Sequence, residues 1–382
     1  PLYSIRLEHD LGFSRSFTGF CCATQAAAAV ISSLITGQMA DRYFSAEKAL
    51  SICAVLGGLD LWLLSSLRDP AGVFFATLAF WLFTGPMILL GTTVCFTHLS
   101  QPQQEFGPVR LWGTVGWMVI GWMMTFWPGD PLQLGGMVAM LLGAYAWTLP
   151  PTPPKAAPDP GKRFAPLEAV ALLREPSFAV YCLCMLGGCV PFPLTTQNTP
   201  LLLRELGITP RILTSVMTIA QVSEILSLAI LPRLLRTLGL RGTMLLGIGS
   251  WLAVMLLLSL GRPLGLMIGS QILNGMFVTG FLIAGQIFVN ELAESDFRAS
   301  VQGLLSGING LGGIFGNLMV GGLREWTHGR LPPTFAVGAV ITFLMFLLFL
   351  IGFRKPYPSL AEELNHVRTG NTPEPSPGIH RR

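Results

Sequence analysis

Polar side chains follow one face of the apolar segment 106–127, "FGPVRLWGTVGWMVIGWMMTFW". Four residues stand at i, i+4, i+7 and i+11: Arg110, Thr114, Trp117 and Gly121. This spacing places them on a single helix face. A guanidinium, a hydroxyl, a large ring and a small residue can together hold a planar polar ligand by hydrogen bonds and stacking. The alternative is an Arg that extends to the membrane surface beside an interfacial Trp.

A second polar face lies in the run "TSVMTIAQVSEILSLAI", residues 214–230. Thr214, Thr218 and Gln221 share this face, and Glu224 lies at its edge. The run contains no Lys or Arg. A carboxyl group at membrane depth is costly unless it faces a cavity or a partner. Glu224 can therefore carry a proton, bind a ligand donor or pair with Arg110; a purely structural polar role is the alternative.

Two further segments carry polar groups. In "GSQILNGMFVTGFLIAGQIFVNE" (269–291), Asn274 shares a face with Phe281, and we expect it to contact a ligand. The segment 177–203 contains "CVPFPLTTQNTPLLL", whose three prolines predict a kinked or broken helix. Interrupted helices often line binding sites in membrane proteins. The alternative is that this stretch forms the outer end of a helix and its loop.

The composition indicates a membrane protein that spans the bilayer many times. The chain has 382 residues, of which 51% are hydrophobic and 12% charged, and its mean hydropathy is +0.59. A soluble domain carries roughly 25% charged residues. The apolar residues fall in blocks close to the roughly 20 residues that cross a bilayer as a helix. The fold class is thus all-α and polytopic.

Other classes of protein are disfavoured by the composition. The net charge of +4 is spread over loops and tail, without the basic cluster of nucleic-acid-binding proteins. The seven cysteines lie within or beside apolar runs, at spacings that suit neither zinc nor a disulfide framework. We therefore expect no metal, no other cofactor and no nucleic-acid partner.

Hydropathy and helix-breaking residues predict about eleven membrane spans. These are 16–36, 47–67, 71–98, 107–127, 131–150, 177–203, 211–236, 241–260, 264–290, 299–323 and 333–353. The Pro-rich stretch "PPTPPKAAPDPGKR" separates five spans from six. We expect an N-terminal helix bundle (1–150), a cytoplasmic linker (151–176), a C-terminal helix bundle (177–353) and a disordered cytoplasmic tail (354–382).

The distribution of Lys and Arg over the short loops places the linker inside the cell, in a multi-pass protein of the cytoplasmic membrane. The charged turns 37–50 and 232–245 resemble each other. If they correspond, the chain consists of two six-helix repeats and lacks the first helix of the first repeat. We therefore expect an N-terminally truncated protein with eleven of twelve helices; a genuine eleven-helix protein is the alternative.

The turn "GQMADRYFSAEK" resembles the Gly-x-x-x-Asp-Arg signature of the major facilitator superfamily, with Gly37, Asp41 and Arg42 at its characteristic positions. The resemblance implies two pseudo-symmetric helix bundles that bind substrate near the midplane and rock against each other. It also implies a gating role for this turn. An ordinary charged cytoplasmic turn is the alternative.

Three segments resemble bacterial nucleoside:proton symporters of that superfamily: "VRLWGTVGW", "AQVSEIL" and "FVNELAESDFRASVQGL". The resemblance implies that five residues bind nucleoside: Arg110, Thr114, Trp117, Gln221 and Glu224. A nucleoside has a flat base for stacking and ribose hydroxyls that need donors and acceptors. We expect a monomer whose partners are a nucleoside, the proton and the lipid bilayer.

The chain departs from the family pattern at several positions. The acidic residue that the family carries in its tenth helix is replaced by Thr279, and a nearby aromatic by Val278. Polar residues of the family's seventh helix fall on Pro191 and Leu194. Since a threonine cannot carry the coupled proton, Glu224 is the candidate for proton coupling, or coupling is absent.

The sequence thus predicts a secondary transporter for proton-coupled nucleoside uptake by alternating access. The alternative within transport is a carrier of a small sugar or another polar metabolite, because Trp117 can also stack on a sugar ring. A membrane enzyme or a non-transporting sensor is a third hypothesis. The sequence shows no nucleophile–base pair and no phosphate-binding loop, so we expect no enzymatic activity.

Overall fold

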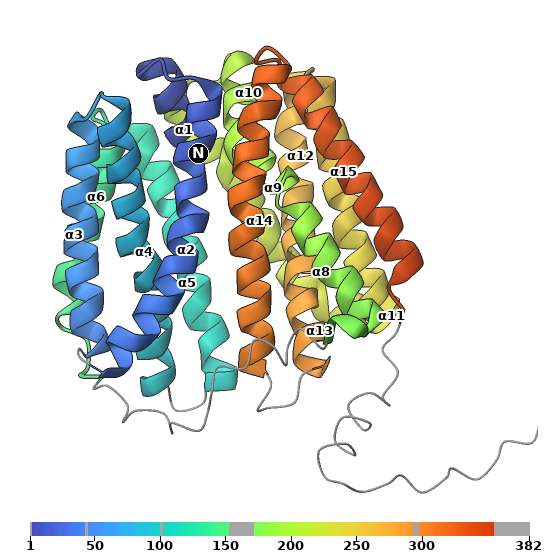
Figure 1. Ribbon diagram of the computed structural model, residues 1–382, viewed down its shortest axis with the longest axis horizontal. Coiled ribbons are helices and arrows are strands. Elements are labelled where there is room, and N and C mark those ends of the chain that lie inside the picture. Colours follow the sequence, from blue (N-terminus) through green and yellow to red (C-terminus); the bar gives the residue numbers. More distant parts are fainter. Residues whose placement is uncertain (1, 43–44, 100–101, 153–171, 293–297, 355–382) are drawn as a thin grey trace, which may run out of the picture.

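The computed structural model describes residues 2–42, 45–99, 102–152, 172–292 and 298–354, and the regular elements in these ranges are helices (Figure 1). Some side chains within these ranges are not described: those of residues 33–42, 89, 96, 102–108, 110, 290–291, 298–300 and 302–303. Among the described residues, six helices are long and apolar enough to cross a membrane, or seven if one bent pair counts as a span. The all-α membrane fold is thereby confirmed.

One group of helices comes from the first part of the chain and is called the N-terminal group here. Its elements are α1 (Leu2–Ile5), η1 (Arg6–Asp10), α2 (Arg15–Arg42), α3 (Ala46–Ser66), α4 (Pro70–His98), α5 (Pro102–Phe126) and α6 (Pro131–Ala146). Helix α3 packs between α4 and α6, and α4 also packs on α2. Figure 1 shows these helices side by side in the blue and teal part of the ribbon.

The second group comes from the remainder of the chain and is called the C-terminal group. Its elements are η2 (Leu172–Arg174), α8 (Pro176–Gly188), α9 (Pro191–Pro193), η3 (Leu194–Asn198), α10 (Thr199–Glu205), α11 (Pro210–Leu260), α12 (Leu264–Phe277), η4 (Val278–Ile283), α13 (Ala284–Leu292), α14 (Arg298–Trp326) and α15 (Leu331–Gly352). The predicted linker falls mostly on 153–171 and the predicted tail on 355–382, outside the described residues. The proposed domain boundaries therefore stay a prediction.

Helix α11 reverses direction at Gly239. This glycine has φ 68° and ψ 176°, a conformation that favours residues without a side chain. Both ends of α11 lie at the same end of the molecule, since Thr214 bonds to α5 and Gly261 abuts Pro332 at the start of α15. Element α11 thus consists of two helices that meet at Gly239, and they correspond to the separate spans predicted at 211–236 and 241–260.

Several helices begin with the same local device. Asp69, Asp130 and Glu175 each accept a hydrogen bond from a backbone N–H in the first turn of α4, α6 and α8, at 2.6, 2.8 and 2.6 Å. A proline follows each of them at the first helical position. An acceptor at the N-cap and a proline at N1 together satisfy the backbone and fix the start of the helix.

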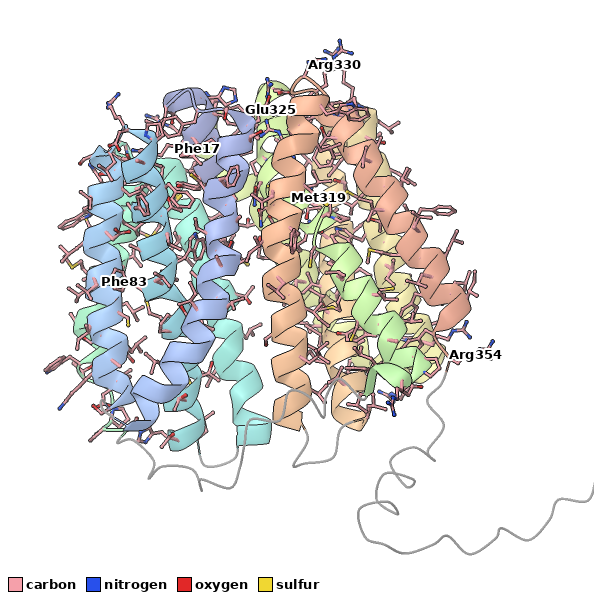
Figure 2. The ribbon with its side chains drawn as sticks, viewed as in Figure 1. Phe17, Phe83, Met319, Glu325, Arg330 and Arg354 are labelled. Carbon is pink, nitrogen blue, oxygen red and sulfur yellow. The ribbon has the colours of Figure 1, made fainter. Side chains whose placement is uncertain are left out.

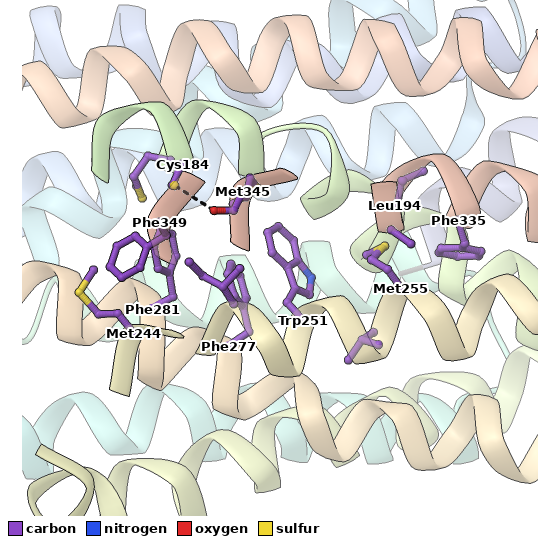
Figure 3. Close-up of a cluster of buried hydrophobic side chains, with 14 of the residues drawn as sticks. Cys184, Leu194, Met244, Trp251, Met255, Phe277, Phe281, Phe335, Met345 and Phe349 are labelled. Atoms are coloured by element: carbon purple, nitrogen blue, oxygen red, sulfur yellow. Dashed lines mark hydrogen bonds between the residues drawn. The ribbon is translucent and has the colours of Figure 1, made fainter. Parts of the chain in front are cut away.

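The C-terminal group has an aromatic core (Figure 3). Trp251 of α11 stacks on Phe277 of α12, with ring centroids 3.8 Å apart, and Phe281 continues the stack. Phe281 meets Phe349 of α15 edge to face. These rings are nearly inaccessible to solvent, and they hold α11, α12, η4 and α15 together as one packed unit.

Two helices of the C-terminal group are irregular. The chain from Pro176 to Glu205 is bent by 42° and contains the π-helical turn η3. The broken helix predicted at 177–203 is confirmed, and the chain stays helical to Glu205 instead of ending in a loop. A second π-helical turn, η4, interrupts the helix that begins at Leu264. Such turns are frequent at functional sites.

Small residues join the two groups along α2 and α14. A Cβ at Gly19 would lie 2.8 Å from the Asn317 carbonyl oxygen, and one at Gly313 would lie 3.0 Å from Ala26. Such close approach is how helices pack in lipid, where burial of apolar surface gives no drive for association. We call this region, at which α2 begins and α14 ends, the outer end, because the charge bias places the opposite loops inside. Figure 2 shows Phe17 and Glu325 near this end.

Candidate functional site

Helices α5 and α11 connect the two groups through the polar faces identified in the sequence. Thr214 Oγ1 donates to the Gly121 carbonyl oxygen at 2.8 Å. A Cβ at Gly121 would lie 3.0 Å from Thr218 Cγ2, so only glycine allows this approach without displacing the threonine. The two predicted polar faces therefore point at each other.

Further hydrogen bonds fasten the outer end of this helix pair. Trp122 Nε1 donates to Thr218 Oγ1 at 3.1 Å, and the hydroxyls of Thr125 and Ser215 lie 2.7 Å apart. Contacts nearer the end of α5 are made by residues nearer the start of α11, so the helices run antiparallel. The pair is closed at the outer end by side chains that bond to each other.

The candidate binding residues lie deeper along the same two helices. Thr114 is seven positions before Gly121, and Glu224 is six positions after Thr218. At about 1.5 Å rise per residue both lie roughly 10 Å below the contact, at a common depth. Trp117 lies between these levels and is 58% exposed. We call Thr114, Trp117, Gln221 and Glu224 the central polar site.

The orientation of α11 places Gln221 and Glu224 away from lipid. The exposed residues Val222, Leu226 and Ile230 mark the outward face of this helix. Gln221 and Glu224 lie on the opposite side, between α5 and α12, and both are half-buried. Gln221 Oε1 is buried and has no hydrogen-bond partner among the described residues. A buried acceptor of this kind requires a donor, which a water or ligand can supply.

The backbone beside Glu224 is fixed by α12. Ser223 Oγ donates to the Ile272 carbonyl oxygen. A Cβ at Gly275 would lie 2.2 Å from the Glu224 nitrogen, so the two helices cross in contact at this point. Because α12 in turn packs into the aromatic core, the carboxylate is mounted on a rigid scaffold.

Asn274 and Thr279 take different environments. Asn274 is half-buried and donates to Gln271 Oε1 at 3.4 Å within its own helix. Thr279 is completely buried in η4, and its Oγ1 has no hydrogen-bond partner among the described residues. The hydroxyl at the position where the resemblance implies a carboxylate is thus enclosed by the protein. Pro191 and Leu194 are also buried, within the C-terminal group.

Several candidate residues have side chains outside the described part of the structure. Arg110 lies in α5, and Gly37, Asp41 and Arg42 lie in the last turns of α2. Their backbones are helical. The predicted contact between Arg110 and Glu224 and the predicted gating role of the turn stay predictions.

Asp60 is a membrane-embedded carboxylate that the sequence analysis did not single out. It lies in α3, and its Oδ2 is buried without a hydrogen-bond partner among the described residues. Neither α4 nor α6 contains Lys, Arg, Asp or Glu in its sequence. A single acidic residue inside an apolar run is the same signal that drew attention to Glu224, and it was available at 47–67.

Two groups of membrane helices meet through opposed polar faces, an arrangement that is typical of secondary membrane transporters. The fold agrees with this class. A solved structure of the nucleoside transporter NupG superposes with a TM-score of 0.80 at 23% identity, covering 93% of this chain and 94% of that one. A crystal structure of a D-xylose-proton symporter superposes with a TM-score of 0.67 at 13% identity, covering 89% and 88%. The chain shares the fold of these two transporters, as the two-bundle prediction from the sequence requires.

Sequence comparison narrows the class further. The model of the nucleoside H+ symporter family matches residues 4–357. Xanthosine permease of Escherichia coli K12 is 28% identical, covering 94% of this chain and 92% of the permease. Nucleoside permease NupG of the same organism is 25% identical, covering 82% and 81%. The chain belongs to the nucleoside H+ symporter family, and it is a multi-pass protein of the inner membrane.

Proposed function

We propose that the central polar site binds the nucleoside that this proton-coupled transporter carries. Trp117 stacks on the base, and Arg110, Thr114 and Gln221 hydrogen-bond the polar groups of base and ribose. The proposal rests on one observation: the buried Gln221 Oε1 has no donor among the side chains that the structure describes, and it stands among polar groups of two opposed helices. Asn274 contributes from α12, next to the Gly275 crossing.

We further propose that Glu224 carries the coupled proton. Thr279 has no acidic group, whereas Glu224 is an ionisable side chain at the depth of the proposed nucleoside. A carboxylate at membrane depth is stable when charged only beside a cation or water, and it is stable in apolar surroundings when protonated. Binding of proton and nucleoside at one place links both to the same movement of the two groups.

The turn with Gly37, Asp41 and Arg42 is proposed to act in that movement. These residues lie in the last turns of α2, the helix that forms the close contact with α14. Replacement of Asp41 by Asn is expected to slow uptake while leaving nucleoside binding intact, because α2 contributes no residue to the central polar site. Binding is read from the shift in melting temperature and uptake from proteoliposomes.

The direct test is uptake of radiolabelled uridine into proteoliposomes, with and without an inward proton gradient. We expect saturable uptake that the gradient accelerates. A thermal-shift panel of nucleosides and sugars separates the substrate classes, because a ligand that binds the folded state raises its melting temperature. Shifts with sugars and none with nucleosides would overturn the substrate assignment.

A further inference from the structure

The outer end contains a buried ion pair that links the two groups. Arg324 Nη2 donates to Glu8 Oε2 at 2.7 Å, and Arg324 Nη1 donates to Glu8 Oε1, so the contact is bidentate. The side chains are only 6% and 10% exposed. Glu8 belongs to η1 of the N-terminal group and Arg324 to α14 of the C-terminal group. Bidentate Arg–carboxylate contacts are among the strongest and most directional in proteins.

Glu8 is held firmly by the N-terminal group. The Tyr3 and Thr77 hydroxyls bond to each other, which ties α1 to α4. Arg6 forms an ion pair with Asp130 and donates to the Ser65 carbonyl oxygen at 2.7 Å. Leu7, the residue before Glu8, is completely buried. Burial also raises the pKa of Tyr3, so its hydroxyl stays neutral. The start of this segment also contacts the C-terminal group, because Ser4 Oγ donates to the Gln197 carbonyl oxygen at 3.1 Å. We expect Glu8 to move with the N-terminal group, to which the preceding residues Arg6 and Leu7 are attached.

Arg324 is held equally firmly by the C-terminal group. Its carbonyl oxygen accepts from Gly329 N at 2.7 Å and from Thr327 Oγ1 at 3.3 Å. The Thr327 and Thr334 hydroxyls lie 3.0 Å apart and join the ends of α14 and α15. Arg324 is thus held by the hydrogen-bonded turn between α14 and α15. Any separation of the two groups at the outer end must break its contact with Glu8.

A second ion pair at the same place differs in burial. Arg15 Nη1 lies 3.8 Å from Glu325 Oε2, and these side chains are 39% and 41% exposed. Exposed pairs of this kind contribute little, whereas removal of one partner from a buried pair leaves an uncompensated buried charge. Of the two pairs, the one formed by Glu8 and Arg324 therefore controls whether the outer end stays closed.

We propose that Glu8 and Arg324 form an outer latch, which holds the transporter in its inward-facing state and opens once per cycle to admit substrate from outside. The latch rests on the proposed function, since only alternating access requires the outer end to open. In the open state both side chains gain water, so loss of one partner penalises the closed state alone and shifts the population outward.

Cys22 is a native reporter for this latch. It lies three residues after Gly19 and four before Ala26, on the face of α2 that contacts α14. It is buried in the closed state. A protein that retains Cys22 and carries alanine at the other six cysteines reports opening through its reaction with a membrane-impermeant maleimide from outside.

The experiment compares the labelling rates of Cys22 in right-side-out proteoliposomes, in which the outer end of the protein faces the maleimide. Glu8→Gln and Arg324→Gln are each expected to raise the rate by about tenfold or more, since each leaves a buried polar or charged group unpaired. Arg15→Gln is the matched control at the exposed pair and is expected to leave the rate within about twofold. The exchanged pair, Glu8→Arg with Arg324→Glu, is expected to restore slow labelling.

Equal rates for Glu8→Gln, Arg324→Gln and Arg15→Gln would overturn the latch. Should a single variant fail to fold, the exchanged pair decides: fast labelling in that folded double variant also contradicts the proposal. Labelling requires no substrate, so it is independent of the uridine assay. Failure of uridine uptake alone counts against the nucleoside site, and failure of the labelling result alone counts against the latch.

Discussion

Helices α5 and α11 use their polar side chains in two different ways along their length. At the outer end, Thr125, Ser215 and Thr218 bond to partners on the opposite helix and close the interface. About one turn deeper than Thr218, Gln221 Oε1 has no hydrogen-bond partner among the described residues. The same kinds of side chain thus close the protein at one level and leave bonding capacity for a ligand at the next.

This difference shows why binding and gating can share two helices. Bonds at the outer end exist only when the two groups are together, so they stabilise one state of the cycle. Groups in the central polar site are satisfied by the ligand, so they change affinity. Substitutions at the two levels are therefore expected to affect different measurements, and the predictions below are arranged to test that separation.

The largest structural effect is expected at the crossing that supports the site. Gly275→Ala places a methyl group against the Glu224 nitrogen and the Ser223 carbonyl carbon, at 2.2 and 2.4 Å. Overpacking of this kind destabilises by about 1–3 kcal/mol. Thermal unfolding in detergent measures it. Gly269→Ala on the same helix is the control, because a Cβ there meets nothing within 4 Å. An equal melting temperature for both variants would refute the rigid crossing.

The next effect concerns affinity. Trp117→Ala is expected to weaken uridine binding by about 1–3 kcal/mol, the range found for base–aromatic stacking. Trp112 is 73% exposed on the opposite face of α5, so Trp112→Ala should leave the affinity unchanged. Calorimetric titration with uridine compares the two. A similar loss in both variants would show that stacking on Trp117 does not hold the base.

A smaller effect is expected at the outer end of the helix pair. Thr218→Val removes the acceptor for Trp122 Nε1 and costs the closed state about 0.5–1.5 kcal/mol. Labelling of Cys22 from outside should rise by a few-fold, with little change in uridine affinity. Thr237→Val serves as the control. The exposed Thr237 hydroxyl donates to the Arg233 and Leu234 carbonyl oxygens of its own helix. If Thr218→Val changes the uridine affinity and not the labelling rate, Thr218 belongs to the binding site and not to the closure of the outer end.

The sequence predicted the helices and the two opposed faces because both follow from local periodicity. Apolar blocks of bilayer length locate the spans, and spacing places Gly121 and Thr218 on faces that the structure brings together. Proline content predicted the broken helix that contains η3. These features depend on residues within one or two turns of each other.

Other features depend on tertiary packing and escaped prediction. Glu8 and Arg324 are 316 positions apart, and nothing in either local sequence indicates the partner. Asp60 was overlooked because the hydropathy of its span is dominated by the apolar residues around it. The buried acceptor of Gln221, which has no partner among the residues that the structure describes, is likewise visible only once α5 and α12 are placed around α11.

The central claim is that Glu224 carries the proton beside the nucleoside. Its most direct test is the pH dependence of uridine uptake in proteoliposomes for Glu224→Gln, with Asp60→Asn as the matched carboxylate-to-amide control. We expect the first variant to lose the pH dependence while still binding uridine, and the second to retain it. Retained pH dependence in Glu224→Gln, with its loss in Asp60→Asn, would contradict the claim and assign the proton to α3.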